Sequence, residues 1–144
     1  MTQFTEVQNT ALEQPLQRRY ISQRRGAGNF TLSYIEGHHA IREANRIFGF
    51  DGWSRETVDV RIVADGMRAE RHGVTYTARV RITVGDIVRE GCGVGHGIDR
   101  SLGQAHESAL KEAETDAMKR ALMTFGDQFG LALYDKAQEN VTDD

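Results

Sequence analysis

The sequence predicts an α+β fold in which an antiparallel β-meander packs against one long helix. Apolar and polar residues alternate along 74–84, as in a strand with one buried face, and Gly85-Asp86 after it is a strong two-residue turn signal. Alanine recurs at every fourth position from Ala105 to Ala121, which is typical of a helix whose small-residue stripe lies close on a sheet. Strands followed by such a helix indicate two layers around one core.

The length and composition fit a single domain over residues 1–144. Of the 144 residues, 39% are hydrophobic and 27% are charged, which allows both a buried core and a soluble surface. The chain has neither an apolar run long enough to span a bilayer nor the N-terminal pattern of a secretory signal. A lone cysteine, Cys92, cannot form an internal disulfide and suits a reducing compartment.

The basic residues are unevenly distributed, although the net charge is −3. Only three of the 18 basic residues are lysine, so 15 are arginine, whose planar guanidinium holds phosphate in a geometry that lysine cannot offer. Four of these arginines lie close together, at Arg18, Arg19, Arg24 and Arg25. This distribution is compatible with nucleic-acid binding but does not require it.

The first fifty residues predict two helices around an arginine-rich loop. Helical spacing of apolar residues indicates a short helix over 3–13. The arginine-rich segment up to Asn29 contains glycine and is expected to be a loop, followed by a short strand over 30–35. A second amphipathic helix, over 40–48, ends at Gly49, a residue type favoured at this position.

Three strands and the long helix follow. The turn between the first two strands is predicted at Asp65-Gly66, a dipeptide typical of hairpins. The long helix is predicted to end at Gly126. The expected elements are strands over 53–63, over 74–84 and from Ile87 onward, and a helix over about 101–125.

Glycine occupies every second position from Gly91 to Gly97. The segment lacks the Lys-Ser or Lys-Thr of a P-loop and the spacing of a dinucleotide-binding motif. Alternating glycines leave one face of a strand without side chains, so a helix, another backbone or a nucleic-acid strand can approach it closely. The sequence leaves packing and ligand binding equally open here.

The chemistry-bearing residues indicate no metal site and no catalytic group. Cys92 and His96 have ligand spacing, but no further local Cys/His pair accompanies them. No serine has the context of a nucleophile elbow, and carboxylates such as Glu112 lie among basic residues as in ordinary ion pairs. We expect no metal, no cofactor and no enzymatic activity. A small hydrolase or nucleotide-binding enzyme built on the glycine strand is the less favoured alternative.

Lys119 and Arg120, near the end of the predicted long helix, have two interpretations. Asp116 lies one turn before both, so their spacing favours ordinary surface ion pairs of little energetic value. Both cations also suit the negative end of a helix dipole. A role in ligand binding is the alternative.

Several segments closely resemble the annealing domain of the Rad52-type recombination mediators. Their order and mutual distances match over about residues 20–136, which leaves 137–144 as an acidic tail. The matching segments are Tyr20 to Arg24 (YISQR), Tyr34 to His38 (YIEGH), Ala44 to Trp53 (ANRIFGFDGW), Lys111 to Leu122 (KEAETDAMKRAL), Phe125-Gly126 and Leu131 to Lys136.

The resemblance implies a β-β-β-α core that assembles into a homo-oligomeric ring or filament. It implies ATP-independent binding of single-stranded DNA and annealing of complementary strands in recombination and repair. In that family the phosphates lie on the floor of a basic groove and the bases point outward. Expected partners are single-stranded DNA, further copies of the chain, and a single-strand binding protein or recombinase, with no membrane. We expect a cytoplasmic, nucleoid-associated protein of phage or bacterial type, with a mitochondrial location as the alternative.

The resemblance also implies the DNA-binding residues, and it reverses the surface-pair interpretation of Lys119 and Arg120. Met123 and Cys92 depart from the family, because better-known members carry a groove arginine and an aromatic residue there. The alternative function is an oligomeric scaffold of the same fold with little DNA binding. The implied inner-groove residues are Arg24, Tyr34, Val94, Lys119 and Arg120. The weaker or outer-site candidates are Arg25, Arg71, Arg79, Arg81 and Arg100.

Overall fold

The computed structural model describes residues 3–144, except for the side chain of Ala27. The chain divides into two compact units, one formed by the residues up to Trp53 and from Leu122 onward, the other by Ser54–Ala121. This division does not test whether residues 1–144 fold as one domain, which stays a prediction. No helix within the described residues is long and apolar enough to cross a membrane.

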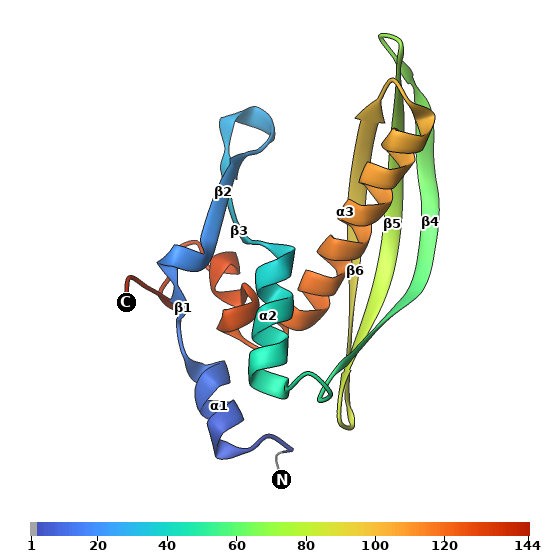
Figure 1. Cartoon of the computed structure of the whole chain (residues 1–144). Helices are drawn as coiled ribbons and strands as arrows, with labels where there is room; N and C mark the ends of the chain where they lie inside the picture. Colours follow the sequence, from blue (N-terminus) through green and yellow to red (C-terminus); the bar gives the residue numbers. More distant parts are fainter. Residues whose placement is uncertain (1–2) are drawn as a thin grey trace. The chain divides into compact units, whose positions relative to one another are not determined.

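The second unit is an antiparallel sheet with a helix along one face, as the sequence predicts (Figure 1). The sheet order is β4-β5-β6, and α3 follows β6 in the chain. The α+β class and the meander are therefore confirmed. The bounds are β4 (Ser54–Arg68), β5 (Arg71–Val84), β6 (Ile87–Asp99) and α3 (Leu102–Met123).

The glycines of β6 face the alanine stripe of α3. A Cβ atom built at Gly91, Gly93, Gly95 or Gly97 would lie closer than 3.0 Å to helix backbone atoms, a separation that real Cβ atoms do not show. The repeats match, because four helix residues rise about 6 Å and two strand residues span about 6.6 Å. Packing is thus the reason for the glycines, and the alternative that this bare face admits a ligand is wrong.

The alternation along β5 is confirmed. Val74, Ala78, Val80 and Ile82 are buried on the side of the sheet that faces α3, and the five alanines of the helix stripe are completely buried. Because strand side chains alternate, the intervening threonines and arginines of β5 lie on the opposite face.

One of the two predicted turns is wrong. Gly85-Asp86 joins β5 to β6 as predicted, with Gly85 at φ 59°. Asp65-Gly66 instead lies within β4, and the turn falls at Ala69-Glu70, where φ is 49° and 67°. The ladder continues to the Arg68–Arg71 pair. The backbone hydrogen bonds gained there offset the cost of two non-glycine residues in left-handed conformation.

The first unit contains the β2–β3 hairpin, two helices and short 3₁₀ turns. Residues 18–29 are not the loop that the sequence suggested, because β2 pairs with β3 from Ile21–Ile35 to Arg25–Thr31. The predicted helices and the 30–35 strand are confirmed. The bounds are α1 (Glu6–Glu13), β1 (Leu16–Gln17), η1 (Arg18–Tyr20), β2 (Ile21–Arg25), η2 (Ala27–Asn29), β3 (Thr31–Ile35), α2 (Gly37–Phe48), η3 (Asp127–Phe129), η4 (Leu131–Tyr134) and β7 (Val141–Thr142).

An aromatic cluster holds the two chain segments of the first unit together. The ring of Phe48, at the end of α2, lies 5.2 Å from Phe125, 5.8 Å from Phe129 and 5.8 Å from Phe4, measured between centroids. Gln128 adds a polar tie, since its Nε2 donates to the carbonyl oxygens of Gln14 and Pro15 at 2.8 Å each.

His39 of α2 is a buried titratable group in this unit. Its ring stacks on Tyr20 with a centroid distance of 4.3 Å, and its Nε2 has no hydrogen-bond partner within the described residues. Burial lowers the pKa of His39 below its usual 6.5, while the charge of Glu43 opposes this shift. The positive charges of His38, Arg42 and Arg46 also lower it.

We expect Gly95→Ala to destabilise the fold by about 3 kcal/mol or more, because the added methyl group would meet helix backbone that cannot move aside. Urea denaturation measures the loss. Gly66→Ala is the matched control, since nothing lies within 4 Å of its Cβ position and its effect should be small. A Gly95→Ala protein as stable as the control would contradict the contact between β6 and α3.

We expect the fold to lose stability as the pH falls below about 6.5. The unfolded chain then takes up a proton at His39 that the folded chain, with its lowered pKa, binds only at lower pH. His39→Phe keeps the stack on Tyr20 and should flatten this part of the pH dependence. Urea denaturation from pH 7.5 to 5 tests this, with exposed His38→Gln as the control. Equal slopes for wild type and His39→Phe would refute it.

Candidate nucleic-acid interface

Arg24 and Tyr34 lie on one face of the β2–β3 hairpin. Arg24 is opposite Leu32, Tyr34 is opposite Ser22, and these four side chains share a face by strand alternation. The guanidinium of Arg24 lies 5.5 Å from the centre of the Tyr34 ring, a cation–π contact that orients an otherwise exposed side chain. Arg24 has no ion pair within the described residues, so its charge is available to an anion.

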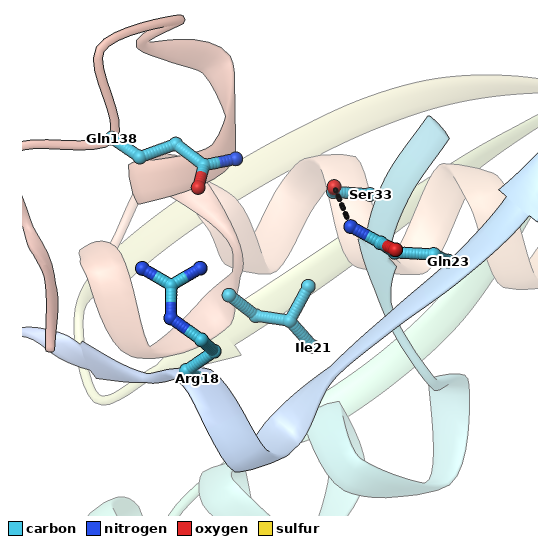
Figure 2. Close-up of a pocket in the computed structure, with 5 residues that line it drawn as sticks. All are labelled: Arg18, Ile21, Gln23, Ser33 and Gln138. Carbon is cyan, nitrogen blue, oxygen red and sulfur yellow. Dashed lines mark hydrogen bonds between the residues drawn. The ribbon is translucent and has the colours of Figure 1, made fainter. Parts of the chain in front are cut away.

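Arg25 lies on the other face of the same hairpin, where a polar pocket adjoins the strands. The pocket has a volume of about 320 Å³, and Gln23 Nε2 donates to Ser33 Oγ at 3.5 Å in its wall (Figure 2). Arg18 also lines it, and its Nε pairs with Asp143 at 2.5 Å. No pair of lining residues could act as acid and base. The complete lining is Arg18, Ile21, Gln23, Ser33 and Gln138.

Lys119 and Arg120 lie in the last turns of α3. Arg120 is exposed and has no ion pair within the described residues, while Lys119 is half-buried. Asp116 forms no ion pair with Arg120 within the described residues, and its Oδ2 accepts the backbone N–H of Val94 at 3.1 Å. The local Asp116–Arg120 pair suggested by the spacing is therefore absent, and Arg120 keeps a positive charge at the surface.

Val94 does not join Lys119 and Arg120 through its side chain. Since the neighbouring glycines face α3, the side chain of Val94 points to the opposite face of the sheet, where it is 44% exposed. Cys92 and His96 share that face, and His96 Nδ1 lies 3.0 Å from Thr75 Oγ1. The face of β6 that is open to a ligand is the one with side chains.

Arg79 and Arg81 are neutralised by carboxylates on the same face of the sheet. Glu90 lies 2.8 Å from Arg81 and 3.7 Å from Arg79, and Glu56 lies 3.0 Å from Arg81. The hydrogen bond that Arg81 donates to Glu90 is the main reason that the pKa of Arg81 rises above its usual value. Sequence reasoning missed Glu90, although the turn at Gly85-Asp86 fixes its position opposite Arg81.

Arg71 and Arg100 lie at the end of the sheet that carries the β4–β5 turn. The ladder places His72 opposite Asp99, so the next residues outward are Arg71 and Arg100. Arg68 pairs with Arg71 across the turn. All three arginines are exposed and have no ion pair within the described residues. Arg68 is not among the predicted site residues, because the predicted turn at Asp65-Gly66 lies four residues before the observed turn at Ala69-Glu70.

The structure places several of the predicted cations in local groups within each unit. Arg24 lies with Tyr34 on the hairpin, Lys119 with Arg120 on α3, and Arg71 with Arg100 and Arg68 at the sheet end. Guanidinium and ammonium groups in such positions can hold phosphates. Within residues 3–144, no group of three or more His, Cys, Asp or Glu side chains could hold a metal ion.

Comparison with known proteins finds one matching family and several similar repair proteins. The family model described as "Rad52/22 family double-strand break repair protein" matches residues 4–144. The DNA repair and recombination protein RAD52 of Kluyveromyces lactis is 44% identical over 129 residues, covering 88% of this chain and 30% of that protein. RAD52 of Saccharomyces cerevisiae is 42% identical over 129 residues, covering 88% and 27%.

A third similar protein is rad22 of Schizosaccharomyces pombe, named as a DNA repair and recombination protein. It is 39% identical over 132 residues, which cover 88% of this chain and 28% of that protein. The chain therefore spans less than a third of these relatives. All three are fungal, and the phage or bacterial type stays a prediction.

Proposed function

This chain belongs to the Rad52/22 family of double-strand break repair proteins, and we propose that it binds single-stranded DNA and anneals complementary strands without a nucleotide cofactor. The observation that carries the proposal is the set of exposed arginines without ion pairs at the positions that match the family's groove, above all Arg24 and Arg120. Family membership supports a role in DNA repair and recombination.

The proposed mechanism requires that the protein binds the DNA backbone and keeps the base edges accessible, and it breaks no covalent bond. Arg24, Lys119 and Arg120 hold phosphates, which releases counterions and leaves the base edges free. A second strand then tests its pairing against the exposed bases, and stacking and pairing supply the free energy of annealing. No catalytic residue, metal or cofactor takes part in this scheme, so we propose a binding protein rather than an enzyme.

We further propose that the active form is a homo-oligomer, as a ring or filament. The outer edge of β4 ends the sheet order, and open edges favour association. Ile62 of β4 is 51% exposed on the face that carries α3, and Ile98 of β6 is 66% exposed on the other face. Exposed apolar side chains on both faces of the sheet suit a head-to-tail contact between copies, which closes into a ring or continues as a filament.

We expect the chain to accelerate annealing of two complementary oligonucleotides without ATP or metal, with a rate that falls as salt is raised. Arg24→Ala, and the double variant Lys119→Ala/Arg120→Ala, should bind all single-stranded sequences more weakly. Each lost phosphate contact should lower the slope of log affinity against log salt by about 0.7. Arg42→Ala is the matched control, since Arg42 is exposed on α2 without an ion pair in the described chain.

Two outcomes would count against the proposal in different ways. Unchanged affinity in a folded Lys119→Ala/Arg120→Ala protein would refute these residues as the site. If sedimentation shows that the wild-type protein is oligomeric but it does not anneal oligonucleotides, the alternative of a scaffold with little DNA binding is favoured. The net charge of −3 supports that alternative.

Glu90→Gln should increase the affinity for single-stranded DNA several-fold and steepen its salt dependence, because it removes the carboxylate shared by Arg79 and Arg81 and leaves only Glu56 paired with Arg81. Fluorescence anisotropy with a labelled oligonucleotide measures both quantities. Glu107→Gln removes the same charge from the Lys111 pair on α3 and is the matched control. If both variants change the DNA affinity equally, Arg79 and Arg81 stabilise the sheet and do not bind DNA.

A further inference from the structure

The tip of the β2–β3 hairpin carries a phenyl ring that the proposed phosphate contacts do not use. Phe30 is 70% exposed, and Leu32, two residues later, is 44% exposed. The hairpin extends beyond α1 and α2 of its own unit (Figure 1). A large apolar ring held in water forgoes the free energy that burial would release, so a ligand that covers the ring would gain this free energy.

The local backbone presents the ring on the same face as Arg24. The N–H of Gly26 donates to the carbonyl oxygen of Phe30 at 2.7 Å and closes the tip. Phe30 is extended, with φ −76° and ψ 141°, so strand alternation places it on the face of Leu32. Leu32 is opposite Arg24. Gly28 has φ 71°, and the Phe30 ring lies about 3.5 Å from the position of a Cβ atom there.

The positive charge around Phe30 indicates which kind of ligand the hairpin can bind. Residues 14–35 contain four arginines and neither aspartate nor glutamate, in a chain whose net charge is −3. Along the hairpin face the order of side chains is Tyr34, then Arg24, then Phe30. This alternation of ring and cation fits a polymer that offers anionic groups and flat apolar faces in turn. Single-stranded nucleic acid has both, whereas duplex DNA hides its base faces in the stack.

We propose that Phe30 is a base-stacking residue, which holds one unpaired base of single-stranded DNA while Arg24 holds a neighbouring phosphate. Stacking uses the face of the base and leaves its Watson–Crick edge free, so the contact is compatible with annealing. It makes the hairpin selective for single strands. This inference rests on the proposed binding of single-stranded DNA and adds to it a residue outside the phosphate contacts.

The test compares Phe30→Ala with wild type on a single-stranded oligonucleotide and on the matching duplex. Loss of one stacked base should weaken single-strand binding about 5- to 100-fold. The salt slope should not change, since no charge is lost, and duplex affinity should stay within about twofold. Phe30→Trp should restore binding, and Phe30→Leu should not, because leucine is apolar but has no π face. A 2-aminopurine base in the oligonucleotide should lose its stacking-dependent quenching in Phe30→Ala.

Phe50→Ala is the matched control, because Phe50 is 88% exposed in the same unit but lies next to Asp51. If wild type binds single strands and Phe30→Ala binds them with the same affinity, the stacking role of Phe30 is overturned, while the proposed function stands. A change of oligomeric state in Phe30→Ala without a change in affinity would mean that a second copy covers the ring, and would also overturn it. Absence of single-strand binding by wild type would overturn the proposed function and this inference together.

Discussion

The backbone contact between the glycines of β6 and the alanine stripe of α3 is the constraint on which the second unit depends. Neither side carries more than a methyl group, so the helix approaches until backbone meets backbone. This closeness fixes which face of β6 is covered, and Val94 and its alternate neighbours must point the other way. It also brings Asp116 within 3.1 Å of the Val94 N–H and Glu112 within 3.3 Å of the His96 N–H.

These two carboxylates accept hydrogen bonds from the open edge of β6, and this contact also determines which charges of α3 remain at the surface. An unpaired edge offers N–H groups to any other strand, and native sheets protect such edges. Here the helix supplies the acceptors from one of its own faces. The carboxylate of Asp116 is thereby directed to the sheet, and Arg120, one turn later, keeps its charge. A contact that stabilises the sheet thus sets the electrostatics of the candidate interface.

The location of free positive charge follows from strand register more than from composition. Arg79 and Arg81 stand beside Glu90 and Glu56 on the sheet, and these exposed pairs contribute little stability but cancel the charge locally. Arg24 lies on a hairpin without carboxylates and stays unpaired within the described chain. A chain with net charge −3 can therefore present local cationic surfaces to an anion.

The sequence by itself determined the class of the fold, the alternation of β5, the turn at Gly85-Asp86 and the end of α2 at Gly49, because periodicity and turn preferences are local properties. It could not place the β4–β5 turn or the strand over 21–25, because both depend on ladder hydrogen bonds between paired strands, which the turn and strand preferences of single residues do not reveal. The matching motifs indicated Arg24 and Arg120. Only the tertiary structure decided that packing explains the glycines and that Arg79 and Arg81 are neutralised, since burial and ion pairing arise when separate segments meet.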